Sequence, residues 1–226
     1  MVLIQSILIY MIPLLFRCRE IILHILSVFS QTTLRFFNND FNQLTQNPHL
    51  VEDFYDLCGR TIESQPELLF SSPDMLLQIV QVAIIGIQIQ HREANSSVIR
   101  FIISFLQQGD YYHHEEGDFA LNFQSYRSVL ESILQNCGQE LMNQLVTIFL
   151  SMFNQYMGGL IGGVPEKRLN DVTSIPAALY VFYEDYRDIF LVTLANSVHS
   201  LDNKILSSEE KESFLSVSGI VIKNHI

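Results

Sequence analysis

The residues best suited to chemistry lie together in one polar segment near the middle of the chain. His113, His114, Glu115, Glu116 and Asp118 all carry side chains that bind metals or transfer protons. Adjacent side chains in one loop rarely point at a common centre, and no second cluster at zinc-finger spacing accompanies them. We therefore predict no metal site here. We expect an exposed, mobile acidic loop, Gly109 to Asp118, that is suited to contact a basic partner.

A glycine-rich segment is the second candidate for chemistry. Gly158-Gly159 and Gly162-Gly163 resemble a phosphate-binding loop, but such a loop ends in Gly-Lys-Ser/Thr, and Val164-Pro165 follows here. The Gly-x-Ser-x-Gly pattern of a hydrolase nucleophile is also absent from the sequence. These observations predict a helix end and a connector. They also predict that the chain is not an enzyme and has no cofactor.

The composition limits the class of partner. The chain has 226 residues, of which 48% are hydrophobic and 16% charged, and its formal net charge is -11. A typical charged fraction is about 25%, so ample apolar surface is available for a core. Binding to nucleic acid requires clustered Lys and Arg, which this acidic chain lacks. An acidic surface instead suits basic protein partners.

The cysteines indicate a reducing compartment. Cys18, Cys58 and Cys137 lie far apart, and no Cys-x-x-Cys pair occurs. An odd, sparse set of cysteines is typical of reduced thiols in the cytosol or nucleus.

The segment Met1–Phe16 is apolar and carries no charged residue. It lacks the basic start and the small-residue cleavage site of a signal peptide. It ends at Arg17, before reaching the roughly 20 residues that a membrane-spanning helix needs. We interpret it as a buried helix or as sequence foreign to the fold, in preference to a membrane anchor.

Apolar residues recur at helical spacing along almost the whole chain. We expect helices over residues 20–37, 50–63, 73–90, 94–107, 119–136, 140–156, 171–183 and 187–200, and a short one that starts at Ser207. Ser72 is expected to cap the third of these, with Pro73 in its first turn. A polar turn, His91 to Asn95, should separate the third helix from the fourth, with Asn95 as the cap.

Helices that alternate with short turns predict an all-α protein. Antiparallel helix pairs that recur every 40 to 47 residues are the signature of HEAT repeats. We therefore predict an α-solenoid of stacked antiparallel helix pairs, in a right-handed stack. The repeats share no visible sequence similarity.

The turn His91, Arg92, Glu93, Ala94, Asn95, followed by Ser97, Val98 and Phe101, resembles a turn of the transportin-SR family in the importin-β superfamily. The resemblance covers roughly residues 18–214. Other positions that match in family order are Cys18-Arg19, Asn47-Pro48-His49, Asp53-Phe54, Ser64-Gln65-Pro66, Leu68-Leu69, His114-Glu115-Glu116, Asp118-Phe119 and Gly138-Gln139-Glu140-Leu141. Asp171-Val172, Leu179, Arg187, Phe190 and Leu194 match more weakly.

This resemblance implies a HEAT-repeat solenoid over residues 17–214, as the C-terminal part of a nuclear import receptor that shuttles between nucleus and cytoplasm. It implies protein cargo, with serine/arginine-rich splicing proteins as the expected kind. The Ran GTPase is a partner of the complete family. The repeats that grip Ran, and the arginine-rich helix that receives phosphorylated Arg-Ser cargo, have no counterpart in this sequence. No cargo-contact residue is therefore carried over.

Two segments depart from the family pattern, Met1–Phe16 and the tail Leu215–Ile226. We expect a C-terminal fragment or an incomplete gene product, and two other hypotheses stay open. One is a helical scaffold without transport activity, and the other is a helical protein tethered to a membrane by its first residues.

We also expect the apolar start of the chain to act as a makeshift cap, that is, a segment that covers the apolar end face of the solenoid. In a solenoid, Ile21, Ile22, Ile25 and Phe29 would face an earlier repeat. We expect Met1–Phe16 to cover part of that face, with Pro13 ending or kinking its helix.

Overall fold

The computed structural model describes residues 2–108, 123–158, 177–184, 186–203 and 206–217. For residues 2–19, 123, 149–158 and 217 it describes the backbone alone. The acidic loop around His113 and most of the glycine-rich segment, from Gly159 onward, lie outside the described residues.

Within these ranges the chain forms helices and turns and contains no strand. The helices are α1 (Val2–Phe37), α2 (Phe41–Gln46), α3 (Pro48–Ser64), α4 (Glu67–Phe70), α5 (Pro73–Gly86), α6 (Arg92–Gln107), α7 (Phe123–Gly158), α9 (Arg187–Ser200) and α10 (Ser208–Val217). Residues 177–184 are also helical. In the described ranges, no helix combines the length and the hydropathy that a membrane span requires.

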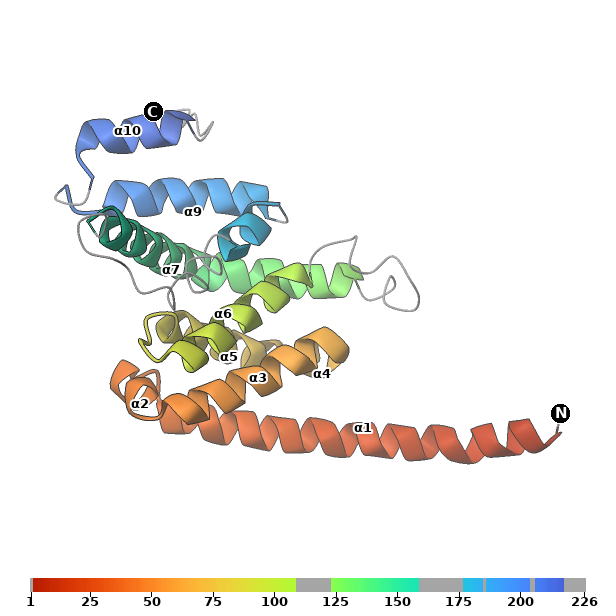
Figure 1. The fold of residues 1–226 in the computed structure, drawn as a ribbon. Helices are drawn as coiled ribbons and strands as arrows, with labels where there is room; N and C mark the ends of the chain where they lie inside the picture. The colour runs from red at the N-terminus through yellow and green to blue at the C-terminus, as the bar shows by residue number, and fades with distance from the viewer. Residues whose placement is uncertain (1, 109–122, 159–176, 185, 204–205, 218–226) are drawn as a thin grey trace.

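The helices are stacked along one direction, from α1 at one end to α10 at the other (Figure 1). Helix α5 packs between α1 and α7, α3 packs along α6, and α9 packs along α7. Elements therefore contact the unit before and the unit after them, as in a helical repeat. The predicted all-α stack is confirmed. Its assignment to the HEAT class stays a prediction.

Aromatic rings connect the layers of the stack. Ring centroids lie 6.2 Å apart between Phe37 and Phe54, 5.4 Å between Tyr55 and Phe101, and 6.2 Å between Phe101 and Phe105. All five side chains are fully buried. The Tyr55 hydroxyl donates a hydrogen bond of 3.0 Å to the Ile79 carbonyl, which ties α3 to α5.

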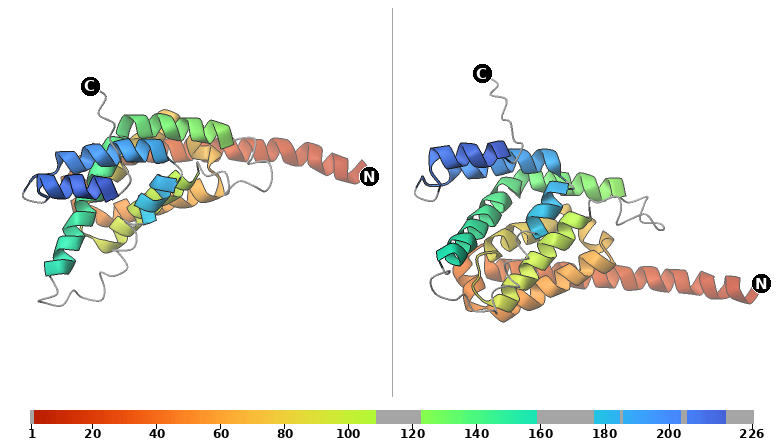
Figure 2. Two further views of the ribbon diagram at one scale, coloured as in Figure 1. Left: turned by 90° about the horizontal axis from the view of Figure 1, so that it is seen from above. Right: turned by 45° about the horizontal axis from the view of Figure 1, so that its top comes forward.

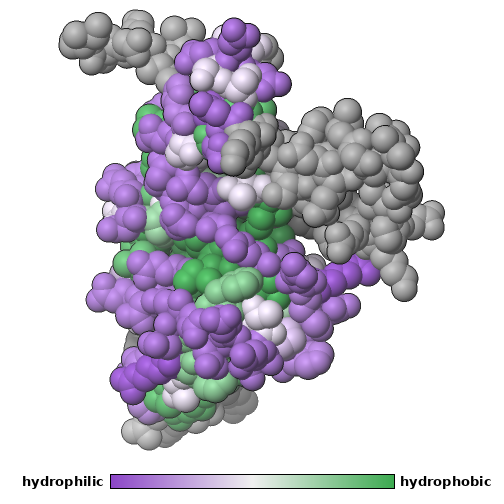
Figure 3. All heavy atoms as spheres, turned by 90° about the vertical axis from the view of Figure 1, so that its left-hand side faces the viewer, coloured by the Kyte–Doolittle hydropathy of each residue, from purple (hydrophilic) through white to green (hydrophobic). Residues whose placement is uncertain are grey.

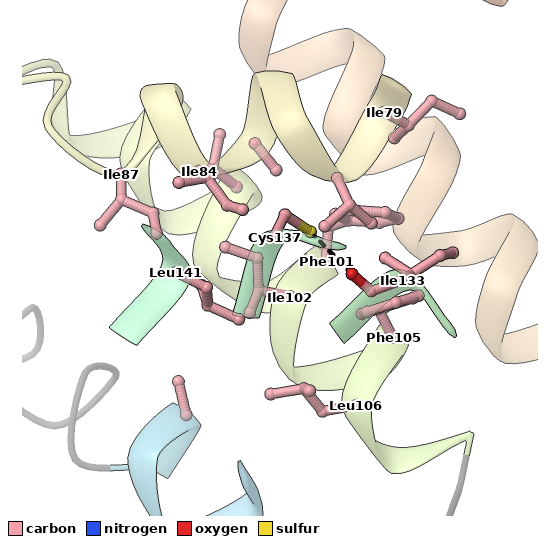
Figure 4. Close-up of a cluster of buried hydrophobic side chains, with 14 of the residues drawn as sticks. Ile79, Ile84, Ile87, Phe101, Ile102, Phe105, Leu106, Ile133, Cys137 and Leu141 are labelled. Atoms are coloured by element: carbon pink, nitrogen blue, oxygen red, sulfur yellow. Dashed lines mark hydrogen bonds between the residues drawn. The ribbon is translucent and has the colours of Figure 1, made fainter. Parts of the chain in front are cut away.

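A second part of the core forms where α5, α6 and α7 meet. Figure 4 shows Ile84 of α5, Ile102 of α6 and Leu141 of α7 pointing toward one another. Burial of such aliphatic side chains contributes roughly 1.5 to 3 kcal/mol each before entropy is subtracted. This cluster fixes α7 against the first half of the stack.

Three sequence-based helix boundaries are wrong, and the first concerns α7. We predicted a break near Cys137-Gly138, but one helix runs from Phe123 to Gly158. A Cβ at Gly138 would lie 3.8 Å from Phe182 and from Ile189, an ordinary contact distance, so both residues pack against α7 at this position. This tertiary packing compensates for the low helix propensity of the glycine.

The second correction concerns α5, which ends at Gly86 and not at Gln90. A Cβ on Gly86 would lie 3.2 Å from Cγ2 of Val98 on α6. The two helices approach closely at this point, and the chain turns over residues 87–91 to begin α6 at Arg92.

The third correction concerns the start of the chain. Pro13 neither ends nor interrupts α1, because one helix spans Val2 to Phe37. A proline removes one backbone hydrogen bond, and a long helix retains the others on both sides. The first part of α1 projects past the other helices instead of folding back over residues 21–29 (Figures 1 and 2). The predicted makeshift cap is therefore wrong.

The last described helix is joined to α9 by a buried lysine. Lys211 is 6% exposed, and its Nζ donates hydrogen bonds to the carbonyls of His199 and Leu201 and to Oδ1 of Asn203. At the start of α10, Ser207 and Glu210 hydrogen-bond each other's backbone amides in a capping box. These bonds to Ser207 lower the pKa of the Glu210 carboxyl.

We expect Lys211→Met to release α10 from α9. The substitution removes the three Lys211 hydrogen bonds to these acceptors, and each lost hydrogen bond costs about 1 kcal/mol. Backbone amides of α10 should exchange with solvent at least about tenfold faster, while those of α6 keep their rates. Hydrogen exchange followed by mass spectrometry measures both. The exposed neighbour provides the control, since Glu212→Met should change neither helix.

Candidate functional site

The His91–Asn95 motif lies at the start of α6. His91 occupies the N-cap position and makes no side-chain capping hydrogen bond, while Arg92 to Asn95 form the first helical turn. The predicted capping role of Asn95 is therefore wrong. Its Nδ2 instead donates a hydrogen bond of 2.6 Å to the carbonyl of Ile87, which closes the connector between α5 and α6. The motif fixes the geometry of a turn.

His91 also touches the start of α3. Its ring lies 5.2 Å from that of His49 in an edge-on arrangement. Nδ1 of His91 is 3.6 Å from Oε2 of Glu93, and Nδ1 of His49 is 3.7 Å from Oε2 of Glu52. Each pair becomes an ion pair only when its histidine is protonated. Across the described residues, no three side chains of the metal-binding types gather into one site.

Polar contacts continue from this point along the seam between α3 and α6. Arg100 of α6 forms an ion pair with Asp56 of α3. One turn further along, the Ser104 hydroxyl donates a hydrogen bond of 2.6 Å to Oε1 of Glu63. These contacts hold the polar edges of the two helices in register above their shared apolar core.

We use the name α3–α6 face for the charged residues that these two helices carry. They are Glu52, Asp53, Asp56, Arg60 and Glu63 of α3, and Arg92, Glu93 and Arg100 of α6. The face has five carboxylates and three guanidinium groups, so it carries an excess of negative charge. Three of the acids are exposed, Asp53, Glu63 and Glu93, and the side chain of Glu93 is 58% exposed. A surface of this kind suits a partner rich in basic side chains.

A polar groove of about 730 Å³ lies between α1 and the start of α5. It is lined by Ser27, Gln31, Leu34, Arg35, Asn38, Asn39, Ser71, Ser72, Pro73, Asp74, Met75, Gln78 and Val82. Asn38 and Asn39 have positive φ angles of 47° and 52°, a conformation that asparagine tolerates better than most residues. The lining includes no histidine or cysteine to activate its serine hydroxyls. The groove can form hydrogen bonds, but it has no arrangement for nucleophilic catalysis.

The described cysteines have no arrangement for catalysis either. Cys58 and Cys137 are free thiols and both are buried. Burial raises the pKa of the Cys58 thiol well above its usual range and that of Cys137 to about 11. Since the thiolate is the nucleophile, neither group is reactive near neutral pH.

Most of the chain aligns with the sequence of a known protein. No protein-family model matches the sequence. The chain is similar to a transportin. It is 25% identical over 189 residues to Transportin MOS14 of Arabidopsis thaliana, and the alignment covers 84% of this chain. The chain spans 17% of the length of that relative.

The sequence predicts only part of the α3–α6 face. Glu52, Asp56 and Glu63 recur at helical spacing on one side of α3, which was the available signal. On α6, Ser104 lies 41 positions after its partner Glu63, and Arg100 lies 44 positions after its partner Asp56. Nothing in the local pattern indicates that separation.

Proposed function

We propose that this chain is a segment of a nuclear transport receptor that binds protein cargo, and that it shuttles between nucleus and cytoplasm with that receptor. The observation that carries the proposal is the similarity to a transportin over 84% of the chain. The stacked all-α architecture supports it, because stacked helix pairs create extended surfaces for protein partners. The described residues contain no reactive thiol and no metal-binding cluster of three side chains that would favour a different function.

The α3–α6 face is the proposed cargo surface. Its acidic excess and the formal net charge of -11 favour basic cargo, such as serine/arginine-rich segments. Phosphate groups would add negative charge to such a segment. On this face an unphosphorylated Arg-Ser peptide should therefore bind more tightly than its phosphorylated form.

A binding assay with both peptides tests the proposal. The complete chain is titrated with an Arg-Ser repeat peptide, unphosphorylated and phosphorylated, at two salt concentrations. We expect the unphosphorylated form to bind more tightly and to weaken with salt. The double variant Asp53→Lys, Glu93→Lys should lower the affinity about tenfold, since each exposed charge contributes up to about 1 kcal/mol.

The matched control is Glu209→Lys, which reverses an exposed acid on α10 away from the face. It should leave the affinity unchanged. If the control weakens binding as much as the double variant, the α3–α6 face is not the cargo surface. Binding of neither peptide would favour the alternative function, a helical scaffold without transport activity.

Ran-GTP serves as a separate bait in the same assay. We expect weak binding or none, because the repeats that grip Ran in the family this sequence resembles have no counterpart in residues 1–226. Submicromolar binding would contradict this expectation.

A further inference from the structure

The rings of His49 and His91 meet where helices α3 and α6 begin. Their centroids are 5.2 Å apart and their planes are inclined by 80°. His49 lies in the first turn of α3, directly after Pro48, and His91 is the N-cap residue of α6. Figure 3 views the molecule from the side on which both helices begin, and hydrophilic side chains cover much of this face. The side chain of His49 is 83% exposed and that of His91 is 34% exposed, so an ion can reach the pair from solvent.

Each ring has a glutamate beside one of its two nitrogens. Nδ1 of His49 is 3.7 Å from Oε2 of Glu52, and Nδ1 of His91 is 3.6 Å from Oε2 of Glu93. A histidine that binds a metal through one nitrogen almost always directs the other nitrogen at a carboxylate, a carbonyl or water, which fixes the ring. In both rings Nδ1 faces the glutamate, so Nε2 is the nitrogen that remains for a metal ion.

The separation of the two rings matches that of two imidazoles on one ion. A zinc ion lies about 2.0 Å from an imidazole nitrogen and about 3.2 Å from the centre of that ring, so two rings on one tetrahedral ion have centres about 5 Å apart. The observed separation of the centroids is 5.2 Å. The positive ends of the two helix dipoles oppose a cation at this place, and the negative charges of Glu52 and Glu93 offset them.

The environment of His91 supports the same conclusion. Its Nδ1 atom is buried and has no hydrogen-bond partner among the described residues. A buried polar atom without a partner is rare in folded proteins, and a missing ion is one explanation. An imidazole that binds a cation through Nε2 donates more strongly from Nδ1, which favours a hydrogen bond to the Glu93 carboxylate.

We infer that His49 and His91 form a two-histidine site for a divalent transition-metal ion such as Zn²⁺, which joins the start of α3 to the start of α6. Imidazole is a ligand that suits such ions. Nε2 of each ring supplies one ligand, and water occupies the remaining positions. A site with two protein ligands is smaller than the groups of three that the described residues lack. This inference is independent of the proposed cargo function, because it uses the contacts of the two rings alone.

Titration of the complete chain with ZnCl₂ tests the site. Isothermal titration calorimetry at neutral pH should show saturable binding of one ion per chain, with a dissociation constant in the micromolar range. His49→Gln and His91→Gln should each weaken this binding at least about tenfold, because either substitution removes one of the two ligands. Both positions are accessible to solvent, so the variants should stay folded, and far-UV circular dichroism checks this.

The double variant His113→Gln, His114→Gln is the matched control, since it removes the adjacent histidine pair of the sequence. It should keep the affinity of the wild-type chain. Hydrogen exchange gives a second readout: Zn²⁺ should slow exchange at the starts of α3 and α6 in the wild type and the control, and in neither single variant.

Three results would overturn the inference. One is the lack of micromolar binding by the wild-type chain. Another is equal affinity in the wild type and in either His49→Gln or His91→Gln, which would place the ion elsewhere. The third is loss of binding in the double variant His113→Gln, His114→Gln.

Discussion

Replacing Tyr55 with alanine is expected to lower the free energy of unfolding by about 4 kcal/mol. Tyr55 is fully buried between Phe54 and Phe101, with ring centroids at 5.2 Å and 5.4 Å. The substitution leaves a cavity where α3, α5 and α6 meet, and it removes the hydrogen bond to the Ile79 carbonyl. Urea denaturation followed by far-UV circular dichroism measures the loss.

Tyr55→Phe separates the packing contribution from that of the hydrogen bond. Phenylalanine keeps the ring, so we expect a loss of about 1 kcal/mol only. Burial raises the pKa of the Tyr55 phenol, so the hydroxyl stays protonated and able to donate at neutral pH. Equal losses in the two variants would show that the hydrogen bond, and not the ring, holds α3 on α5.

Replacing Gly86 with valine is expected to destabilise the protein by about 2 to 3 kcal/mol. A Cβ at this position would already lie 3.2 Å and 3.5 Å from the two methyl carbons of Val98. The added methyl groups of valine must push α6 away from the end of α5. The same urea denaturation measures this effect.

Gly59→Ala is the matched control for the glycine substitution. Gly59 is also buried in a helix, but its Cβ would meet the nearest atom, Cα of Phe101, at an ordinary 3.9 Å. Alanine should therefore fit and should stabilise α3 by up to about 1 kcal/mol through its higher helix propensity. If Gly86→Val caused no loss of stability, the α5–α6 contact would be looser than the structure indicates.

The spacing of apolar residues alone predicted several helices correctly. The sequence predicts a helix over residues 187–200, and α9 spans Arg187–Ser200. It also places Val51, Phe54, Leu57, Cys58 and Ile62 on one face of α3, and all of these except Leu57 are buried. Helical periodicity reports burial directly, because the side of a helix that packs on the core must be apolar.

Other elements depended on contacts between distant segments. The sequence predicts a break at Gly138, yet α7 continues through it because Phe182 and Ile189 pack there. The short helices α2 and α4 lie between the helices that the sequence predicts. A propensity summed over a few residues is a weak prior, and tertiary packing readily overrides it.

The candidate site was likewise predicted only in part from the sequence. The motif from His91 to Asn95 was visible in the sequence, but its role in closing the α5–α6 connector depends on the position of the Ile87 carbonyl. The pairs Asp56–Arg100 and Glu63–Ser104 join residues whose proximity arises only when α6 packs on α3.

Local sequence pattern was enough to predict that this protein is all-α, that its helices form pairs able to stack, and that one of its turns resembles a turn of an import receptor. These properties depend on neighbours a few residues apart, which the periodicity of a helix records. The packing of the folded chain shows which helices contact one another, which acids share a face, and that α1 is one continuous helix with Ile21, Ile22 and Ile25 exposed. Those outcomes depend on which surfaces meet in space, and no local pattern specifies the partner of an apolar face.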